Sequence, residues 1–196
     1  MSKVPDKIIY GDLETTGLDA NKNGIIQIAL ILERKGLEID RWTSFVAPAV
    51  TDEITEDALK ITSRTREEIE TFPQPVVVAA SMVQFLSKHI SPYDPKDKWA
   101  LCGHNSAFDK NFLYSFFRRY TSVSLHNFVH VYLIDTYAMA QLLWLNDELP
   151  GVANLKLPTL AEYMKIPHRA HEALSDTEVA RDLFKIFNKM LRATNG

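Results

Sequence analysis

Cysteine is nearly absent from this sequence: Cys102, within an apolar run, is the only one among 196 residues. A single cysteine excludes an intramolecular disulfide framework and a zinc site made of several cysteines. It also fits a protein that works in a reducing compartment, and we therefore expect a cytoplasmic location.

Long hydrophobic runs are also missing. A membrane-spanning helix needs roughly 18 to 20 consecutive apolar residues, and no run of that length occurs. The first residues include an acid and are not followed by the apolar segment of a signal peptide. We therefore expect neither a signal peptide nor a membrane partner.

The sequence has no excess of positive charge. Its 22 Lys and Arg residues stand against 25 Asp and Glu residues, which gives a net charge of −3. A strong duplex-binding protein neutralises many phosphates with Lys and Arg, so the charge argues against that class. It leaves open an enzyme that binds one strand end, where metal ions and a few local cations hold the phosphates.

The order of the expected elements is typical of an α/β protein. Three apolar β runs come first, at 7–10, 25–32 and 39–46. Helical and strand patterns then alternate: we expect helices at 51–61, 63–70, from Pro75 onward, after Gly103, and at 136–145, 159–165 and 175–191, and strands at 99–102 and 131–134. Without a linker or repeat, we expect one domain over 1–196 with its core at about 7–191.

A first acidic motif, Asp12-Leu13-Glu14, follows the first β run. Residues two apart on a strand point to the same face, so the two carboxylates should lie side by side. Their repulsion raises one pKa unless a cation lies between them, and oxygen ligands suit Mg²⁺ or Mn²⁺. Taken alone this motif is weak evidence, because surface turns often contain it.

A second motif runs from Gly103 through His104 and Asn105 to Phe108 and Asp109. We expect Asp109 in the first turn of a helix that carries several Phe residues. The helix macrodipole alone would favour an acid there, but it does not account for the preceding His-Asn pair. His104 and Asn105 fit hydrogen-bonding residues that steady the turn better than they fit metal ligands.

A third motif places His171 five residues before Asp176. On one regular helix this spacing is about 140° of rotation, so the two side chains could not address the same point. We therefore expect His171 on an irregular stretch and Asp176 in the first turn of the last helix. A rigid carboxylate suits a metal ligand, and a mobile imidazole suits a proton acceptor. Alone, His171 would be read as a solvated loop residue.

Together, and in this order, the three motifs resemble those of the DEDDh 3′–5′ exonucleases, which include epsilon-type proofreading exonucleases and ribonuclease T. The resemblance covers nearly the whole chain. It implies a ribonuclease-H-like fold, a mixed five-stranded sheet flanked by helices. It also implies hydrolysis of phosphodiester bonds at the 3′ end of single-stranded nucleic acid, with DNA slightly favoured over RNA and nucleoside 5′-monophosphates as products.

The resemblance further implies two divalent metal ions, Mg²⁺ or Mn²⁺. Asp12 would bridge both ions, Glu14 and Asp176 would bind one of them, and Asp109 would lie nearby. Neutral His171 would take the proton from the attacking water.

Substrate contacts are also implied by the resemblance. The turn of Thr15, Thr16, Gly17 and Leu18 would hold the terminal nucleotide, and Phe108 would pack near the terminal bases, although plain core packing explains Phe108 equally well. His104 and Asn105 are counted with these expected substrate-binding residues. Lys110, Arg118 and Arg119 are cations that could meet the strand, but a solvated surface charge explains each of them better.

Two other functional classes stay open: a silent nuclease fold that serves as a binding module, and a phosphohydrolase for small nucleotides. A silent protein should have lost a carboxylate or the histidine, and all are present. The chain stops soon after the last expected helix, so we expect a standalone enzyme, or one recruited through its surface, with a second copy or a polymerase or repair protein as candidate partners.

Three smaller expectations concern single residues. Asp135 should cap the helix that starts at Thr136. Gly11 stands where many relatives have a bulkier residue, which could loosen the strand end. His89, His126, His130 and His168 show no recognisable partner spacing.

Overall fold

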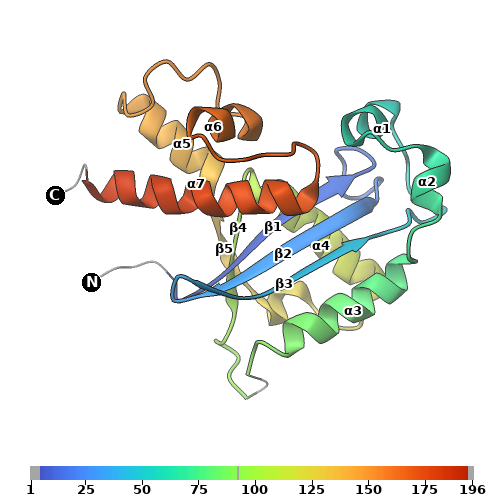
Figure 1. Ribbon diagram of the computed structural model, residues 1–196. Helices are drawn as coiled ribbons and strands as arrows, with labels where there is room; N and C mark the ends of the chain where they lie inside the picture. The colour runs from blue at the N-terminus through green and yellow to red at the C-terminus, as the bar shows by residue number, and fades with distance from the viewer. Residues whose placement is uncertain (1–4, 92, 194–196) are drawn as a thin grey trace.

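A mixed five-stranded sheet forms the centre of the computed structural model, which describes residues 5–91 and 93–193 (Figure 1). The strands are β1 (Lys7–Thr15), β2 (Ile25–Arg34), β3 (Leu37–Phe45), β4 (Trp99–Gly103) and β5 (Val129–Asp135), in the spatial order β3-β2-β1-β4-β5. The first three strands pair antiparallel, and β1, β4 and β5 run parallel. The expected fold class is confirmed. The expectation of no signal peptide rests largely on residues 1–4, which lie outside the described residues.

Helices cover both faces of this sheet (Figure 1). One face carries α3 (Pro75–Ser87) and α4 (Ser106–Tyr120), and the other carries α5 (Thr136–Leu145), α6 (Leu157–Tyr163) and α7 (Ala173–Ala193). Two short helices, α1 (Glu56–Thr62) and α2 (Arg66–Glu70), lie beyond the end of β1, and a 3₁₀ turn at Leu125–Asn127 precedes β5. Within the described ranges, no helix is both long and apolar enough to cross a membrane.

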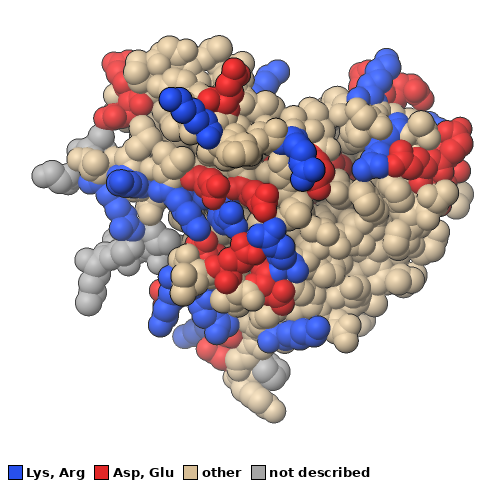
Figure 2. Space-filling view, in the orientation of Figure 1, with Lys and Arg blue, Asp and Glu red and all other residues tan. Residues whose placement is uncertain are grey.

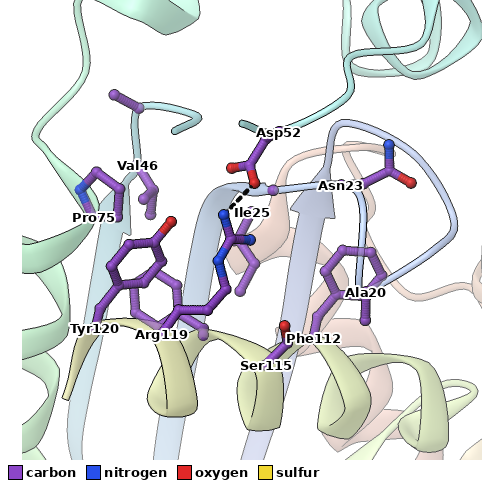
Figure 3. Close-up of a pocket in the computed structure, with 13 residues that line it drawn as sticks. Ala20, Asn23, Ile25, Val46, Asp52, Pro75, Phe112, Ser115, Arg119 and Tyr120 are labelled. Carbon is purple, nitrogen blue, oxygen red and sulfur yellow. Dashed lines mark hydrogen bonds and ion pairs between the residues drawn. The ribbon is translucent and has the colours of Figure 1, made fainter. Parts of the chain in front are cut away.

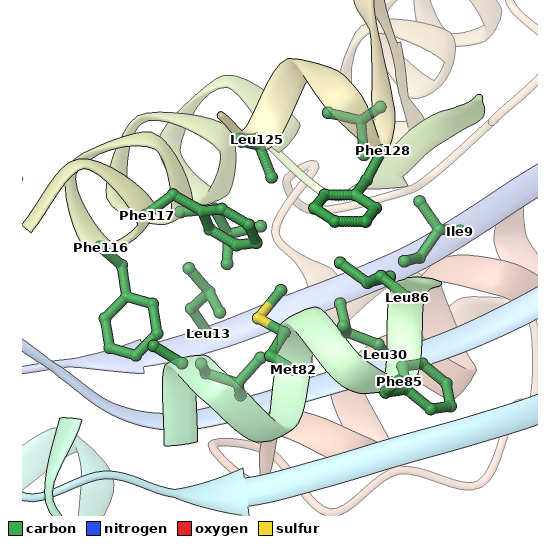
Figure 4. Close-up of a cluster of buried hydrophobic side chains, with 14 of the residues drawn as sticks. Ile9, Leu13, Leu30, Met82, Phe85, Leu86, Phe116, Phe117, Leu125 and Phe128 are labelled. Carbon is green, nitrogen blue, oxygen red and sulfur yellow. The ribbon is translucent and has the colours of Figure 1, made fainter. Parts of the chain in front are cut away.

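The main hydrophobic core lies between the sheet and the α3–α4 layer (Figure 4). Leu13 and Leu30 from the strands meet Met82 and Leu86 from α3 and Phe117 from α4. Burying a side chain of this size contributes roughly 1.5–3 kcal/mol. Contacts from both layers therefore fix the position of β1, the strand that carries the first acidic motif.

The alternation of β1 directs its acids to the opposite face. Ile8 and Tyr10 belong to a separate core cluster with Phe184 of α7, and the Tyr10 and Phe184 ring centroids are 6.0 Å apart. Because side chains on a strand alternate, Asp12 and Glu14 continue this row towards α7. Gly11 does not loosen the strand end, since β1 stays paired with β2 as far as Thr15.

Three expected helix boundaries differ from the structure. The expected helix over 51–61 is wrong in its first half, because Asn23 and Glu53 form a bridge and Thr55 caps α1, which starts only at Glu56. Ser63 ends α1 in a left-handed conformation instead of starting the next helix, which Thr65 caps. The expected helix over 159–165 begins earlier, since α6 starts at Leu157 with Pro158 in its first turn, a favourable place for proline.

Candidate active site

Asp12 and Glu14 lie on β1, beside the start of α7. Across the sheet they pair with Ala29 and Gln27 of β2. The side-chain oxygen of buried Gln27 accepts a hydrogen bond from the Ala173 N–H at 3.4 Å. The neighbour of Glu14 therefore holds the first residue of α7 and brings the first turn of that helix to the carboxylates.

Asp176 lies in this first turn of α7, as expected, and His171 lies in the irregular stretch before it. The His171 backbone has a φ of 63°, a left-handed conformation that is uncommon for a residue other than glycine. Its N–H donates to Asp176 Oδ2 at 3.2 Å, which offsets part of that cost. His171 is exposed, so its imidazole is open to solvent and to a ligand.

The imidazole and two of the carboxylates converge. Glu14, His171 and Asp176 each offer one ligand atom, and these atoms all lie within 4.8 Å of one another. Among the described residues this is the only group of three or more His, Cys, Asp or Glu side chains so arranged.

Asp109 reaches the same region from the first turn of α4, where its side chain is buried. The Leu13 N–H of β1 hydrogen-bonds to the Asp109 carboxylate. Gly103 makes this approach feasible: a Cβ there would lie 3.0 Å from the Gly11 carbonyl oxygen and 3.3 Å from Asp109 Oδ2. Because Gly103 has no side chain, the start of α4 can approach β1 this closely. A larger residue at this position would push the two apart.

Burial raises the pKa of all four carboxyl groups, and repulsion by neighbouring acids adds to it for Asp12, Glu14 and Asp109. Burial is the largest cause in each, and for Asp12, whose pKa is raised well above its usual range, repulsion from Asp109, Asp176 and Glu14 adds to it. The pKa of Glu14 is raised to about 7, with repulsion from Asp176 as the second cause. The pKa of Asp109 is raised to about 8, although backbone N–H groups partly counter burial. Burial also raises the pKa of Asp176, against a lowering by its hydrogen bond with His168.

This donor set fits divalent cations. Four carboxyl groups that resist ionisation together become a favourable site once positive charge lies among them. Carboxylate oxygens are the ligands that Mg²⁺ and Mn²⁺ prefer in proteins.

The His104-Asn105 turn is organised by hydrogen bonds within the protein. His104 Nδ1 lies 2.9 Å from Thr136 Oγ1, and its Nε2 lies 2.9 Å from the Leu155 carbonyl oxygen. Asn105 takes a left-handed conformation with a φ of 72°, which asparagine tolerates. The steadying role expected for this pair is therefore confirmed for His104, and substrate contact by either residue stays a prediction.

Asp135 organises the same corner of the sheet. Its carboxylate caps α5 by accepting the Tyr137 N–H at 2.9 Å, which confirms the expected role. It also accepts the Asn105 N–H at 3.0 Å and the Ser106 N–H at 3.1 Å. One side chain thus fixes the starts of both α4 and α5.

The turn after the acidic pair has a fixed base and an exposed tip. Thr16 is fully buried and is held by hydrogen bonds with Gly24 and Glu53 on both its backbone and its side chain. The Thr15 hydroxyl donates to the Gly17 carbonyl oxygen at 2.7 Å. Leu18 is 87% exposed, so an apolar side chain stands out from a rigid turn.

Phe108 lies partly exposed on α4. Its ring centroid is 4.8 Å from that of Phe112, and it packs against the main core. Both expected roles of this residue, core packing and contact with a base, are therefore compatible with its position.

Two residues near the carboxylates escape sequence reasoning. His168, whose side chain is 9% exposed, forms a short hydrogen bond through Nε2 with Asp176 Oδ1. The Arg64 guanidinium lies over the Phe45 ring, 5.0 Å from its centroid, lines a small cavity with Glu14 and His171, and lowers the pKa of Glu14. His168 and Arg64 lie in irregular segments, so their contacts follow no helix or strand spacing. No sequence motif therefore predicts the contacts.

Comparisons with known proteins give matches over most of the chain. Residues 9–184 match the family model RNase_T, described as Exonuclease. The DNA polymerase III subunit epsilon of Treponema pallidum is 30% identical over 177 residues, which are 88% of this chain and 72% of that protein. The DNA polymerase III PolC-type of Oceanobacillus iheyensis is 28% identical over 174 residues, and the chain spans only 11% of its length.

Solved structures show the same fold. A crystal structure of Escherichia coli Exonuclease I in complex with a dT13 oligonucleotide matches with a TM-score of 0.74 and 19% identity, over 93% of this chain and 41% of that one. The zinc-bound form of the same enzyme with single-stranded DNA matches with a TM-score of 0.77 and 20% identity, over 94% and 41%.

The raised carboxyl pKa values predict how the stability of the metal-free protein depends on pH. The folded state holds protons on Glu14 and Asp109 that the unfolded chain releases above its ordinary carboxyl pKa, about 4. The resulting stability is full below that pKa and is lost as pH rises through about 7 for Glu14 and about 8 for Asp109. In EDTA, the melting temperature should therefore be higher at about pH 5 than at about pH 8.

The matched control is Glu14→Gln, which removes one of these protons and should reduce the difference in melting temperature. Added Mg²⁺ should raise the melting temperature more at the higher pH, where fewer protons compete for the carboxylates. An equal pH dependence in the wild type and in Glu14→Gln would show that Glu14 does not contribute to it.

Proposed function

Because the chain belongs to the exonuclease family that matches it over residues 9–184, we propose that it is a metal-dependent 3′–5′ exonuclease. It would remove nucleotides one at a time from the 3′ end of single-stranded nucleic acid. The observation that carries this proposal is the convergence of Glu14, Asp176 and His171 beside the repelling carboxylates Asp12 and Asp109.

Asp12, Glu14, Asp109 and Asp176 would hold two divalent cations, Mg²⁺ or Mn²⁺. Their raised pKa values support this role, because such groups gain most from nearby positive charge. When bound, such ions stabilise the charge that develops on the attacking and the leaving oxygen of a phosphodiester. His168 would orient Asp176 by its hydrogen bond, as residues behind metal ligands commonly do.

His171 would act as the general base. Its neutral imidazole would accept a proton from the attacking water and pass it to solvent, to which the side chain is exposed. Its place in an irregular segment, outside a helix, suits a residue that has to move when a nucleotide enters or leaves.

The terminal nucleotide would lie against the turn Thr15–Leu18. Exposed Leu18 and half-exposed Phe108 offer apolar surface for its base, and Asn105, whose side chain is exposed, lies one turn before Asp109. His104 would act indirectly, by holding that turn. Relatives named as DNA polymerase III components, and the oligonucleotide held by Exonuclease I, favour DNA as substrate and a polymerase as a candidate partner.

Labelled oligonucleotides test the polarity. With Mg²⁺, a 5′-labelled single strand should give a descending ladder, and a 3′-labelled strand should release labelled mononucleotide at once. A blocked 3′ end should resist, and EDTA should stop the reaction. Cleavage of a closed circular single strand would indicate an endonuclease, and hydrolysis of free nucleotides alone would indicate a small-nucleotide phosphohydrolase.

Two substitutions separate the proposed base from a proposed ligand. His171→Ala should reduce turnover on the order of 10²–10⁴-fold and leave Mn²⁺ binding nearly intact, because only the proton acceptor is lost. Asp12→Ala should abolish both turnover and tight Mn²⁺ binding. His130→Ala, which changes a histidine stacked on Tyr132 of β5, serves as the matched control. Near-full activity of His171→Ala would show that this histidine is not the general base.

A further inference from the structure

A groove leads away from the candidate active site along α4. Its walls include Leu18 and Asn21 from the β1–β2 turn and Phe108, Asn111, Tyr114 and Arg118 from α4. We call these residues the α4 groove. Its volume is about 510 Å³, within the usual range of small-molecule and nucleotide sites.

The α4 groove follows one face of the helix. Phe108, Asn111 and Arg118 are spaced by three and seven residues, which keeps them on the same side. From Phe108 to Arg118 the helix rises about 15 Å, the length of roughly four stacked nucleotides. The groove starts at Leu18 and Phe108, the two residues that we assign to the terminal base.

The exposed groups of the α4 groove suit a single strand. Tyr114 is 48% exposed and offers a ring on which a base can stack, and Asn111 is exposed nearby. Asp19 also lines the groove, and its carboxylate accepts the Asn21 N–H at 2.9 Å. Stacking on aromatic rings combined with a local cation is the usual basis of single-strand binding without sequence preference.

Arg118 is the cation of α4 that is left for a phosphate. Lys110 Nζ donates to the Val131 carbonyl oxygen at 2.9 Å. Arg119, which does not line the groove, bonds to Asp52 at 2.5 Å (Figure 3). Exposed Arg118 has no ion-pair or hydrogen-bond partner in the part of the chain that the structure describes. The cavity drawn in Figure 3, which Arg119 and Asp52 help to line, measures about 10 Å³ and has room for one water molecule only.

Cations on the face shown in Figure 2 are differently arranged. Lys and Arg alternate there with Asp and Glu over α7 and β3. Arg41 binds Glu38 at 2.7 Å and Glu178 at 2.9 Å, and Arg181 binds Glu38 at 2.6 Å. These cations are neutralised by acids, so this network offers a strand little net positive charge.

We propose that the α4 groove binds the nucleotides that precede the terminal one in a single strand, with a base against Tyr114 and a phosphate against Arg118. This inference rests on the proposed function, because it takes the occupant of the adjoining site to be a strand end. Affinity should therefore increase with strand length until the groove is filled, and a dinucleotide should gain little from Arg118.

Fluorescence anisotropy with Ca²⁺ in place of Mg²⁺ tests the proposal without turnover. The probes are 5′-fluorescein strands of two and six thymidine nucleotides. For the six-nucleotide strand, Arg118→Glu and Tyr114→Ala should each raise Kd roughly tenfold, and the loss for the two-nucleotide strand should be several times smaller. Arg118→Lys should recover most of the affinity that Arg118→Glu loses.

Lys189→Glu is the matched control, since it makes the same charge reversal at an exposed position on α7, across the sheet from α4. The proposal would be overturned if Arg118→Glu weakened the binding of both strands equally, or if Lys189→Glu weakened binding as much as Arg118→Glu does. A melting temperature for each variant separates lost binding from lost folding. Parallel digestion in Mg²⁺ tests the proposed function separately: if the wild type digests neither strand but the length-dependent losses remain, the exonuclease assignment fails and the groove stands.

Discussion

Mutual repulsion among four acids at one end of the sheet is the constraint on which this structure depends. Asp12 and Glu14 come from β1, Asp109 from α4 and Asp176 from α7, and burial raises the pKa of each, with repulsion by neighbouring acids adding to it for the first three. Holding these acidic groups together, on three separate elements, therefore lowers the stability of the metal-free fold. Such an arrangement is explained by a ligand that carries positive charge, and we propose that divalent cations are that ligand.

The contacts that oppose this repulsion are short-range and lie directly behind the acids. The Leu13 N–H holds Asp109, Gln27 holds the first residue of α7, and His168 holds Asp176. Gly103 lets β4 and the start of α4 approach β1. These contacts join β1 to α4, β2 to α7, and the segment before α7 to its first turn. The geometry of the carboxylates therefore depends on how the helices pack on the sheet, which suits a site that must position a phosphate.

Much of this arrangement could be predicted from the sequence. The period of a strand placed Asp12 and Glu14 on one face, and the 100° turn of a helix separated His171 from the helix of Asp176. Repulsion was expected to raise a carboxyl pKa, yet burial is the larger cause, and burial depends on packing that no short motif encodes. His168 and Arg64 reach the site through irregular segments, and the start of α1 is set by the bridge between Asn23 and Glu53. Such tertiary contacts leave no periodic trace in a sequence.

Anomalous scattering from crystals soaked in Mn²⁺ tests most directly whether the four acids bind divalent cations. We expect anomalous density in contact with Asp12, among Glu14, Asp109 and Asp176, and none at these positions in crystals of Asp12→Ala. Density found only elsewhere in the wild type, with none at Asp12, would contradict the claim that these acids are held together for divalent cations.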